Sequence, residues 1–211
     1  MYCLSVSGLG ISLEPLLWCV KYRPRSWDEF IGQSAAISQL RGLATSGTLT
    51  NMIFFGPAGT GKSASAEVFS RELLGSNYGS NFMHLNIRDV WATPVTKAKR
   101  SVQDLAKLER KKRSRLDEYM SVIYREAKAS LKARGKSRRP SRTQLLQEAI
   151  RFFASTATVS DLDVKILVLD EADALSFSMQ QALRRTMELY SDICRMILIT
   201  PTLAGWSPAI L

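Results

Sequence analysis

The sequence predicts an α/β fold in which helices cover both faces of a parallel sheet. Apolar runs typical of strands alternate along the chain with stretches typical of helices. One of these runs, Lys165–Leu169 (KILVL), lacks the polar alternation of a half-exposed strand, as is usual for strands buried on both faces. With 211 residues, of which 45% are hydrophobic and 23% charged, the chain is long enough for one domain with its own core.

The first half of the chain supplies a strand, a helix and a second strand. Met52–Phe55 is a short apolar run that ends at a glycine and is typical of a buried strand. Ser63–Leu74 follows as a helix, and Gly75 is a typical signal for its C-terminal end. Phe82–Ile87 is interpreted as the second strand.

The last third of the chain repeats the alternation. Lys165–Leu169 is the third predicted strand, Ser178–Tyr190 a helix and Arg195–Thr200 the fourth strand. These elements complete the pattern that favours parallel pairing.

Two further helices are predicted between the second and third strands. Apolar residues recur there at spacings of three and four, which indicates a helix with one apolar stripe. Its members are Leu116, Tyr119, Met120, Ile123, Ala127 and Leu131. The segment Gly135–Pro140 breaks the pattern, and Ser141 with Gln144 resembles a capping box that starts a second helix through Phe153.

This same region carries the excess positive charge of the chain. Residues 97–151 hold 18 Lys and Arg against 6 Asp and Glu, whereas the whole chain has a net charge of +10. The remainder is therefore nearly neutral. Such a segment either contacts the phosphates of a nucleic acid or forms a solvated helical face, and both interpretations stay open.

A complete phosphate-binding motif follows the first strand. The sequence GPAGTGKS matches the pattern G-x-x-x-x-G-K-[S/T], with a strand before it and a helix after it. Backbone N–H groups of such a loop surround phosphate, the lysine adds a cation, and the serine hydroxyl is a ligand for Mg²⁺. The predicted nucleotide-binding residues are Gly56, Pro57, Ala58, Gly59, Thr60, Gly61, Lys62 and Ser63.

An acidic pair, Asp170-Glu171, ends the third strand. Ligands of parallel sheets gather at the carboxyl ends of the strands, so we expect both acids to face the phosphate loop. Asp170 is then a candidate to hold Mg²⁺, together with Ser63, and Glu171 to orient or deprotonate an attacking water. The two acids are the predicted catalytic residues.

Other candidate sites are weaker. His84 is the single histidine and has no cysteine beside it, which favours a packed or hydrogen-bonded structural role over a metal site. Cys3, Cys19 and Cys194 lack metal-ligand spacing and are expected to be free thiols. No apolar run is long enough for a membrane span.

Two blocks of the sequence resemble the small subunits of replication factor C. The first is Leu17–Pro24 (LWCVKYRP), continued by Phe30–Gln33 (FIGQ). The second is Leu169–Leu175 (LDEADAL) followed by Gln180–Ser191 (QQALRRTMELYS). The resemblance covers roughly residues 16–90 and 142–210.

The resemblance implies an AAA+ P-loop fold of three layers, α/β/α, with a parallel sheet. It implies binding of ATP and Mg²⁺ and a Mg-dependent ATPase that is weak or inactive as an isolated piece. The implied partners are the other subunits of a mostly five-membered clamp-loader ring, the sliding clamp and primer–template DNA. The implied location is the cytoplasm, or the nucleus of a eukaryote.

Further residue roles come from the resemblance alone. By matching position, Tyr22, Arg23 and Pro24 are expected near the adenine, with Ile31 and Gly32 close by. Gln33 also belongs to this group. The helix from Ser178 is expected at the surface that faces the clamp and the next subunit, where Arg184 and Arg185 are either interface residues or solvated ones.

The chain also departs from the family. Pro201, flanked by Thr200 and Thr202, stands where a polar residue usually senses the γ-phosphate. The sequence ends before the family's Ser-Arg-Cys motif and before the fifth strand, so the first strand is expected at an open sheet edge. We therefore expect an incomplete AAA+ domain at 16–211, a basic helical insertion at 91–141 and an unassigned extension at 1–15.

Three functions remain open on this basis. The first is an ATP-hydrolysing subunit of a clamp loader that places the sliding clamp on DNA during replication. The second is a structural subunit that binds ATP without hydrolysing it, which Pro201 favours. The third is another AAA+ ATPase of DNA processing.

Overall fold

The computed structural model describes residues 17–47, 49–93, 95–98, 115–156 and 164–211. Its centre is a parallel sheet of four strands in the order β1-β4-β3-β2. The strands are β1 (Met52–Phe55), β2 (Phe82–Asn86), β3 (Lys165–Asp170) and β4 (Cys194–Thr200). The predicted α/β class is confirmed, and β1 lies at one edge of the sheet, as expected.

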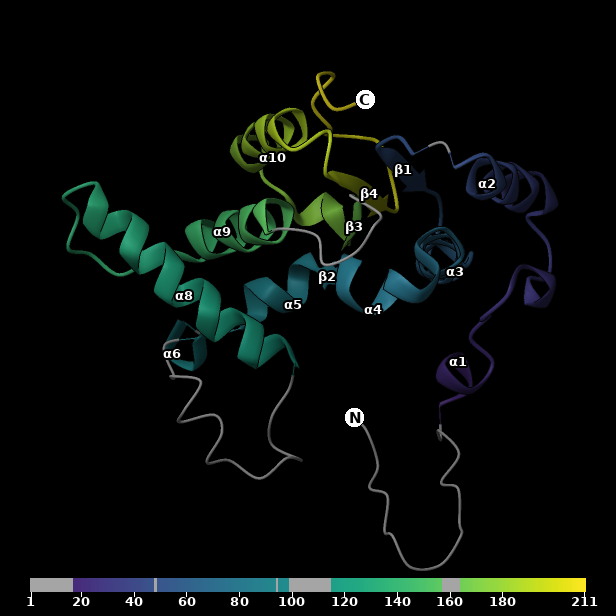
Figure 1. Cartoon of the computed structure of the whole chain (residues 1–211), viewed down its shortest axis with the longest axis horizontal. Coiled ribbons are helices and arrows are strands. Elements are labelled where there is room, and N and C mark those ends of the chain that lie inside the picture. The colour runs from purple at the N-terminus through teal and green to yellow at the C-terminus, as the bar shows by residue number, and fades with distance from the viewer. Residues whose placement is uncertain (1–16, 48, 94, 99–114, 157–163) are drawn as a thin grey trace, which may run out of the picture.

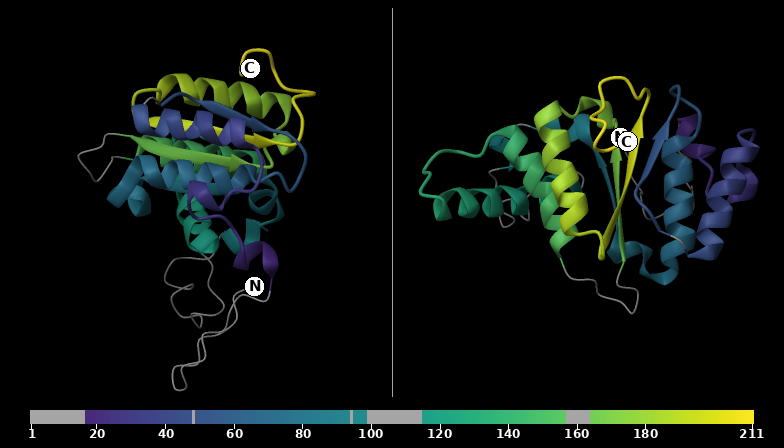
Figure 2. Two further views of the ribbon diagram at one scale, coloured as in Figure 1. Left: turned by 90° about the vertical axis from the view of Figure 1, so that its right-hand side faces the viewer. Right: turned by 90° about the horizontal axis from the view of Figure 1, so that it is seen from above.

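Helices lie on both faces of the sheet (Figures 1 and 2). On one face, α3 (Lys62–Leu74) packs against the sheet and α2 (Ser34–Ser46) packs outside α3. On the other face lie α5 (Ile87–Ala92), α9 (Arg142–Ser155) and α10 (Phe177–Leu189). The result is the three-layer arrangement that the alternating pattern predicts.

The alternation of side chains along β3 divides the core in two. Ile166 and Val168 pack with Phe69 of α3, whereas Leu167 and Leu169 pack with the helices of the opposite face. The five residues Lys165–Leu169 are all buried. Because β3 is central and covered on both faces, the residue at its end, Asp170, has a fixed position.

The second strand is one residue shorter than the sequence pattern suggests. The predicted strand ran to Ile87, but β2 ends at Asn86 and Ile87 begins α5. The side-chain oxygen of Asn86 accepts hydrogen bonds from the backbone N–H groups of Arg88 and Asp89, at 2.9 and 3.1 Å. This N-cap satisfies donors that would otherwise lack partners, so the chain turns into a helix there.

The described part of the basic region beyond residue 114 forms a helical hairpin. It contains α8 (Arg115–Ala133), which carries the expected apolar stripe, and α9, which begins after Ser141. The predicted capping box is present: the Ser141 hydroxyl accepts from the Gln144 N–H, and the Gln144 side chain accepts from the Ser141 N–H. In Figures 1 and 2 the hairpin projects on the side of the sheet opposite α2.

Several shorter elements are also present among the described residues. They are α1 (Trp18–Lys21), η1 (Trp27–Glu29), η2 (Gly75–Asn77), α4 (Tyr78–Asn81), α6 (Val95–Ala98) and η4 (Ala172–Ala174). No helix among the described residues is long and apolar enough to cross a membrane.

Candidate nucleotide site

The phosphate loop joins β1 to α3 through a run of glycines. Gly59 and Gly61 have φ angles of +81° and +84°, a region in which residues with a Cβ are strained. These angles curl the backbone so that α3 begins directly after the loop, at Lys62. The open N–H groups of the first helical turn and the positive end of the helix dipole together favour an anion at this point.

Lys62 lies folded back onto its own loop. Its ammonium donates hydrogen bonds to the carbonyl oxygens of Gly56 and Pro57, at 2.7 and 2.6 Å. A phosphate group near the loop would compete for these donors, because charge-assisted hydrogen bonds to phosphate are stronger than those to neutral carbonyls. The contacts therefore keep a cation at the mouth of the loop.

The two motifs predicted to hold Mg²⁺ meet directly. The Ser63 hydroxyl donates a hydrogen bond of 2.6 Å to Oδ2 of Asp170, although the two residues are 107 positions apart. The other carboxylate oxygen of Asp170 accepts from the Glu171 N–H at 2.9 Å. A hydroxyl beside a carboxylate is the hard-oxygen donor set that Mg²⁺ prefers, so these residues fit the ion.

His84 extends this contact into a network of charges. One ring nitrogen, Nε2, lies 3.1 Å from Oδ2 of Asp170, and the other, Nδ1, lies 3.1 Å from Oε1 of Glu67 on α3. Arg23 donates to the same Glu67 oxygen at 2.7 Å. The network thus links the N-terminal segment, α3, β2 and β3 at the site.

The pKa values follow from this arrangement. Burial alone would lower the pKa of His84, but its hydrogen bonds to Asp170 and Glu67 and their charges outweigh burial and raise it to about 9. Burial pushes the pKa of Asp170 up, while His84 and Ser63 bring it below its ordinary value. The pKa of Glu67 is lowered in the same way, against burial, by His84 and Arg23.

The sequence predicted a hydrogen-bonded role for His84 but not its place in the site. The alternation of side chains along β2 and β3 would have indicated it. In the observed register His84 pairs with Val168, and Asn86 pairs with Asp170. Residues two apart and residues directly opposite share a face of the sheet. His84 and Asp170 therefore both face α3.

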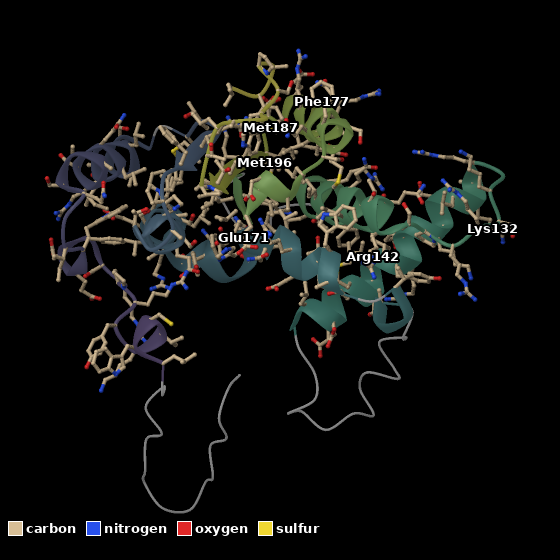
Figure 3. All side chains as sticks on the ribbon, turned by 180° about the vertical axis from the view of Figure 1, so that it is seen from behind. Lys132, Arg142, Glu171, Phe177, Met187 and Met196 are labelled. Carbon is tan, nitrogen blue, oxygen red and sulfur yellow. The ribbon has the colours of Figure 1, made fainter. Side chains whose placement is uncertain are left out.

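Glu171 meets its expectation only in part. It lines the cleft beside Asp170 and has a φ angle of +53°. Its carboxylate, however, is paired with Nε of Arg88 at 3.1 Å, and Arg88 also contacts Asp173 at 2.8 Å. Figure 3 shows Glu171 near the centre of the molecule, at the end of β3. Arg88 was not among the predicted site residues.

A cleft of about 660 Å³ gathers most of the predicted residues. From the N-terminal segment it takes Tyr22, Arg23 and Pro24. Ile31 and Gly32, by contrast, line a neighbouring hollow of about 770 Å³ against β1, and so does Thr60. Both hollows share Pro24, Gly59, Gly61 and Lys62.

The end of β4 closes another side of the cleft. Thr200 and Pro201 line it, at the place where the family has a polar sensor. The Thr200 hydroxyl is buried and donates to the carbonyl of Thr202 at 2.8 Å, and the hydroxyl of Thr202 accepts from the Ala204 N–H at 3.1 Å. Both hydroxyls thus have partners within their own loop.

Metal and thiol chemistry at other places has little support. In the part of the chain that the structure describes, no group of three or more His, Cys, Asp or Glu residues is arranged to hold a metal ion. Cys19 is an exposed free thiol and Cys194 a buried one, while Cys3 lies outside the described residues.

Comparison with known families agrees with this geometry. A sequence model described as an AAA domain matches residues 47–205, which include the phosphate loop and the acidic pair. The chain belongs to the AAA domain family. The AAA fold that the sequence resemblance implied is thereby confirmed.

Similar curated proteins include replication factor C small subunits. The replication factor C small subunit of Archaeoglobus fulgidus is 33% identical over 86% of this chain and 41% of its own length. Replication factor C small subunit 2 of Pyrobaculum islandicum is 31% identical over 92% of this chain and 45% of its own length. The chain thus spans less than half the length of these relatives. The resemblance to replication factor C small subunits is confirmed.

Among solved structures, domain III of the replication initiation protein DnaA of Thermotoga maritima is similar in arrangement. The match covers 88% of this AAA domain and 61% of that chain, with a TM-score of 0.48 and 14% identity.

Proposed function

We propose that this AAA domain binds ATP with Mg²⁺ and hydrolyses it as part of a clamp loader of the replication factor C type. The observation that carries the proposal is the 2.6 Å contact between Ser63 and Asp170. It joins the phosphate loop to the acidic end of β3, and phosphoryl transfer needs these two parts together.

Each site residue has a role in this proposal. The loop N–H groups and Lys62 bind the phosphates, and Tyr22, Arg23 and Pro24 lie on the side of the cleft where the base would fit. Ser63 and Asp170 would hold Mg²⁺, which when bound neutralises charge on the phosphate oxygens. Glu171 orients a water and accepts its proton.

The assembly and partners are inferred from the relatives' names. We infer that this AAA domain acts beside other clamp-loader subunits, a sliding clamp and primer–template DNA, in the cytoplasm or, in a eukaryote, in the nucleus. Since the chain spans less than half of those relatives, isolated turnover is expected to be weak. The domain limits stay as proposed, with 91–141 as a basic insertion and 1–15 unassigned.

The first test is nucleotide binding by titration calorimetry with Mg·ATP. Lys62→Ala is expected to weaken binding at least tenfold, because it removes the cation of the loop. Lys128→Ala, an exposed lysine on α8, is the matched control and should bind as the unchanged protein does. Equal affinities in all three proteins would place the nucleotide elsewhere and contradict the proposal.

A second candidate is a subunit that holds ATP without turnover. The pairing of Glu171 with Arg88 favours it, because a carboxylate engaged by an arginine is not free to accept a proton from water. Glu171→Gln separates the two functions. In a hydrolysing domain it should retain ATP affinity within about threefold and lower steady-state turnover at least tenfold. Glu171→Gln should also keep bound ATP intact for longer in a hydrolysing domain, whereas an equal lifetime of bound ATP in both proteins would favour the binding subunit.

A further inference from the structure

The basic hairpin ends in a tip that is strongly and uniformly positive. We call residues Lys132–Arg142, between the last turn of α8 and the first of α9, the basic tip. These residues include no Asp or Glu. Figure 3 shows Lys132 near the outer end of the hairpin. All six cations of the tip are exposed: Lys132, Arg134, Lys136, Arg138, Arg139 and Arg142.

The tip is anchored by specific contacts at both of its ends. Where α8 ends, the N–H of Gly135 donates to the Lys132 carbonyl and the N–H of Lys136 to the Leu131 carbonyl, each at 2.9 Å. Where α9 begins, Pro140 is buried and the capping box of Ser141 fixes the turn. The backbone that carries the six cations is therefore fixed at both of its ends.

The two helices below the tip hold it away from the sheet. Met120, Ile123 and Ala127 of α8 are buried with Leu145 and other residues of α9. The hydroxyl of Tyr119 crosses the hairpin and donates to the Ala149 carbonyl at 2.5 Å. The contact between α8 and α9 is apolar and closely packed. The cations of the basic tip are therefore carried on a rigid projection.

The cations of the tip lack acidic partners. In the part of the chain that the structure describes, none of the six forms an ion pair with an Asp or Glu. By contrast, Arg151 of α9 is paired with Glu148, and Arg184 of α10 is paired with Glu188 at 2.8 Å. Six gathered and unpaired cations repel one another, so an anion that neutralises them would bind favourably.

A further cation lies beyond the tip, on α10. A groove of about 480 Å³ between the hairpin and α10 is lined by Arg134 of the tip and by Arg185, which is exposed on α10. Arg151 lines it as well, beside its partner Glu148. Two elements far apart in sequence thus contribute cations to one surface.

The composition of the tip indicates which polyanion fits. It has no Phe, Tyr or Trp between residues 132 and 142. Proteins that hold single strands stack the bases on aromatic side chains, and this surface offers none. A double helix instead presents its charge outside, at one phosphate per about 1.7 Å of axis, and is bound by Lys and Arg alone.

We propose that the basic tip, together with Arg185, binds the phosphate backbone of duplex DNA without reading its sequence. The choice of DNA rests on the proposed function, whereas the preference for a duplex backbone comes from the tip itself. Its contacts position the domain on the duplex, as phosphate contacts do in general.

The test measures binding of a labelled duplex of random sequence by fluorescence anisotropy, without nucleotide, over a series of salt concentrations. The tip variant carries Arg134→Gln, Lys136→Gln and Arg138→Gln. The control variant carries Arg25→Gln, Arg41→Gln and Arg71→Gln, which are exposed cations far from the tip in sequence. Both variants lose the same net charge. A difference in their DNA affinity therefore depends on where the substituted cations lie.

The tip variant is expected to bind at least tenfold more weakly near 0.1 M salt. Its slope of log affinity against log salt should be smaller by about 2 to 3, because each lost phosphate contact removes about 0.9. The control should stay within about threefold of the unchanged protein. Equal losses in both variants, or no loss in either, would overturn the proposal.

Two comparisons separate the partner and the proposed function. Single-stranded DNA or an acidic polypeptide that binds the tip as tightly as the duplex does would overturn the assignment to duplex DNA. Lys62→Ala should bind duplex as the unchanged protein does, and the tip variant should bind Mg·ATP normally. Failure of the nucleotide site and failure of the tip are therefore seen in different measurements.

Discussion

His84 is placed between two carboxylates that come from different elements. Nδ1 and Nε2 lie at the same 3.1 Å from Glu67 and Asp170, so a protonated ring donates to both. Each carboxylate in turn has a second donor, Arg23 for Glu67 and Ser63 for Asp170. With only 24% of its side chain exposed, the ring is screened little by water.

This network predicts how stability depends on pH. The pKa of His84 rises from 6.5 in the unfolded chain to about 9 in the folded one, so its contribution is complete below pH 6.5 and is lost as the pH rises through 9. Glu67 and Asp170 have lowered pKa values, so their contributions are present above about pH 4.5 and are lost as the pH falls through the folded values. Stabilisation by the network is therefore greatest between about pH 4.5 and 6.5.

His84→Gln tests the alkaline side. Urea unfolding in the presence of a chelator should show a loss of about 1 to 3 kcal/mol at pH 6, because an ion-paired imidazolium is removed. That loss should shrink as the pH rises from 6.5 to 10. A loss of constant size over this range would mean that His84 is neutral in the folded protein.

Some residues of the site could be predicted from the sequence and others could not. The phosphate loop is contiguous, and each of its residue types has a chemical reason, so it could be predicted in full from Gly56 to Ser63. The partners of Asp170 could not, because His84 precedes it by 86 positions and only the strand register brings the two together. Arg88 was missed for the same reason, since its pairing with Glu171 depends on tertiary packing.

The type of each helix or strand could be predicted from the sequence, but its first and last residues could not always be. The strands β1 and β3 and the helices α3, α8, α9 and α10 lie where periodicity placed them, within two residues. The end of β2 was wrong by one residue because a side chain, Asn86, captures the backbone donors that would continue the strand. Local hydrogen bonds of this kind compete with hydrophobic pattern and are weak signals in sequence.

The start of α9 gives a prediction at this scale. Ser141→Ala removes one half of the capping box and is expected to lower the free energy of unfolding by about 1 kcal/mol (range about 0.5 to 2). Ser137→Ala, at an exposed position in the same tip, is the matched control and should change stability by less than about 0.5 kcal/mol. Both are measured by urea unfolding, and an equal effect of the two would show that the cap contributes nothing.

On the scale of the whole molecule, the exposed edge of the sheet is the feature with the largest consequence. β1 pairs with β4 on one side, and no described strand pairs with its other side. Phe55 at the end of β1 is 62% exposed. An edge with unpaired N–H and C=O groups and an apolar side chain favours association with another strand.

Phe55→Lys should therefore reduce self-association. Sedimentation velocity at increasing protein concentration is expected to show a smaller associated fraction for this variant than for the unchanged protein. Phe177→Lys is the control, because Phe177 on α10 is 64% exposed but lies away from the edge. If the two substitutions reduced association equally, exposed apolar side chains in general, and not the sheet edge, would be its cause.

The sheet order also has a consequence for how the chain is made. Among the described strands β1 comes first along the chain, yet its only partner there, β4, comes last, at Cys194–Thr200. At a synthesis rate of about 5 to 20 residues per second, β1 and the phosphate loop wait roughly 7 to 30 seconds for it. During that interval the nascent strand is exposed to chaperones and proteases. A codon change that slows translation of the basic hairpin would lengthen this exposure without altering a single amino acid.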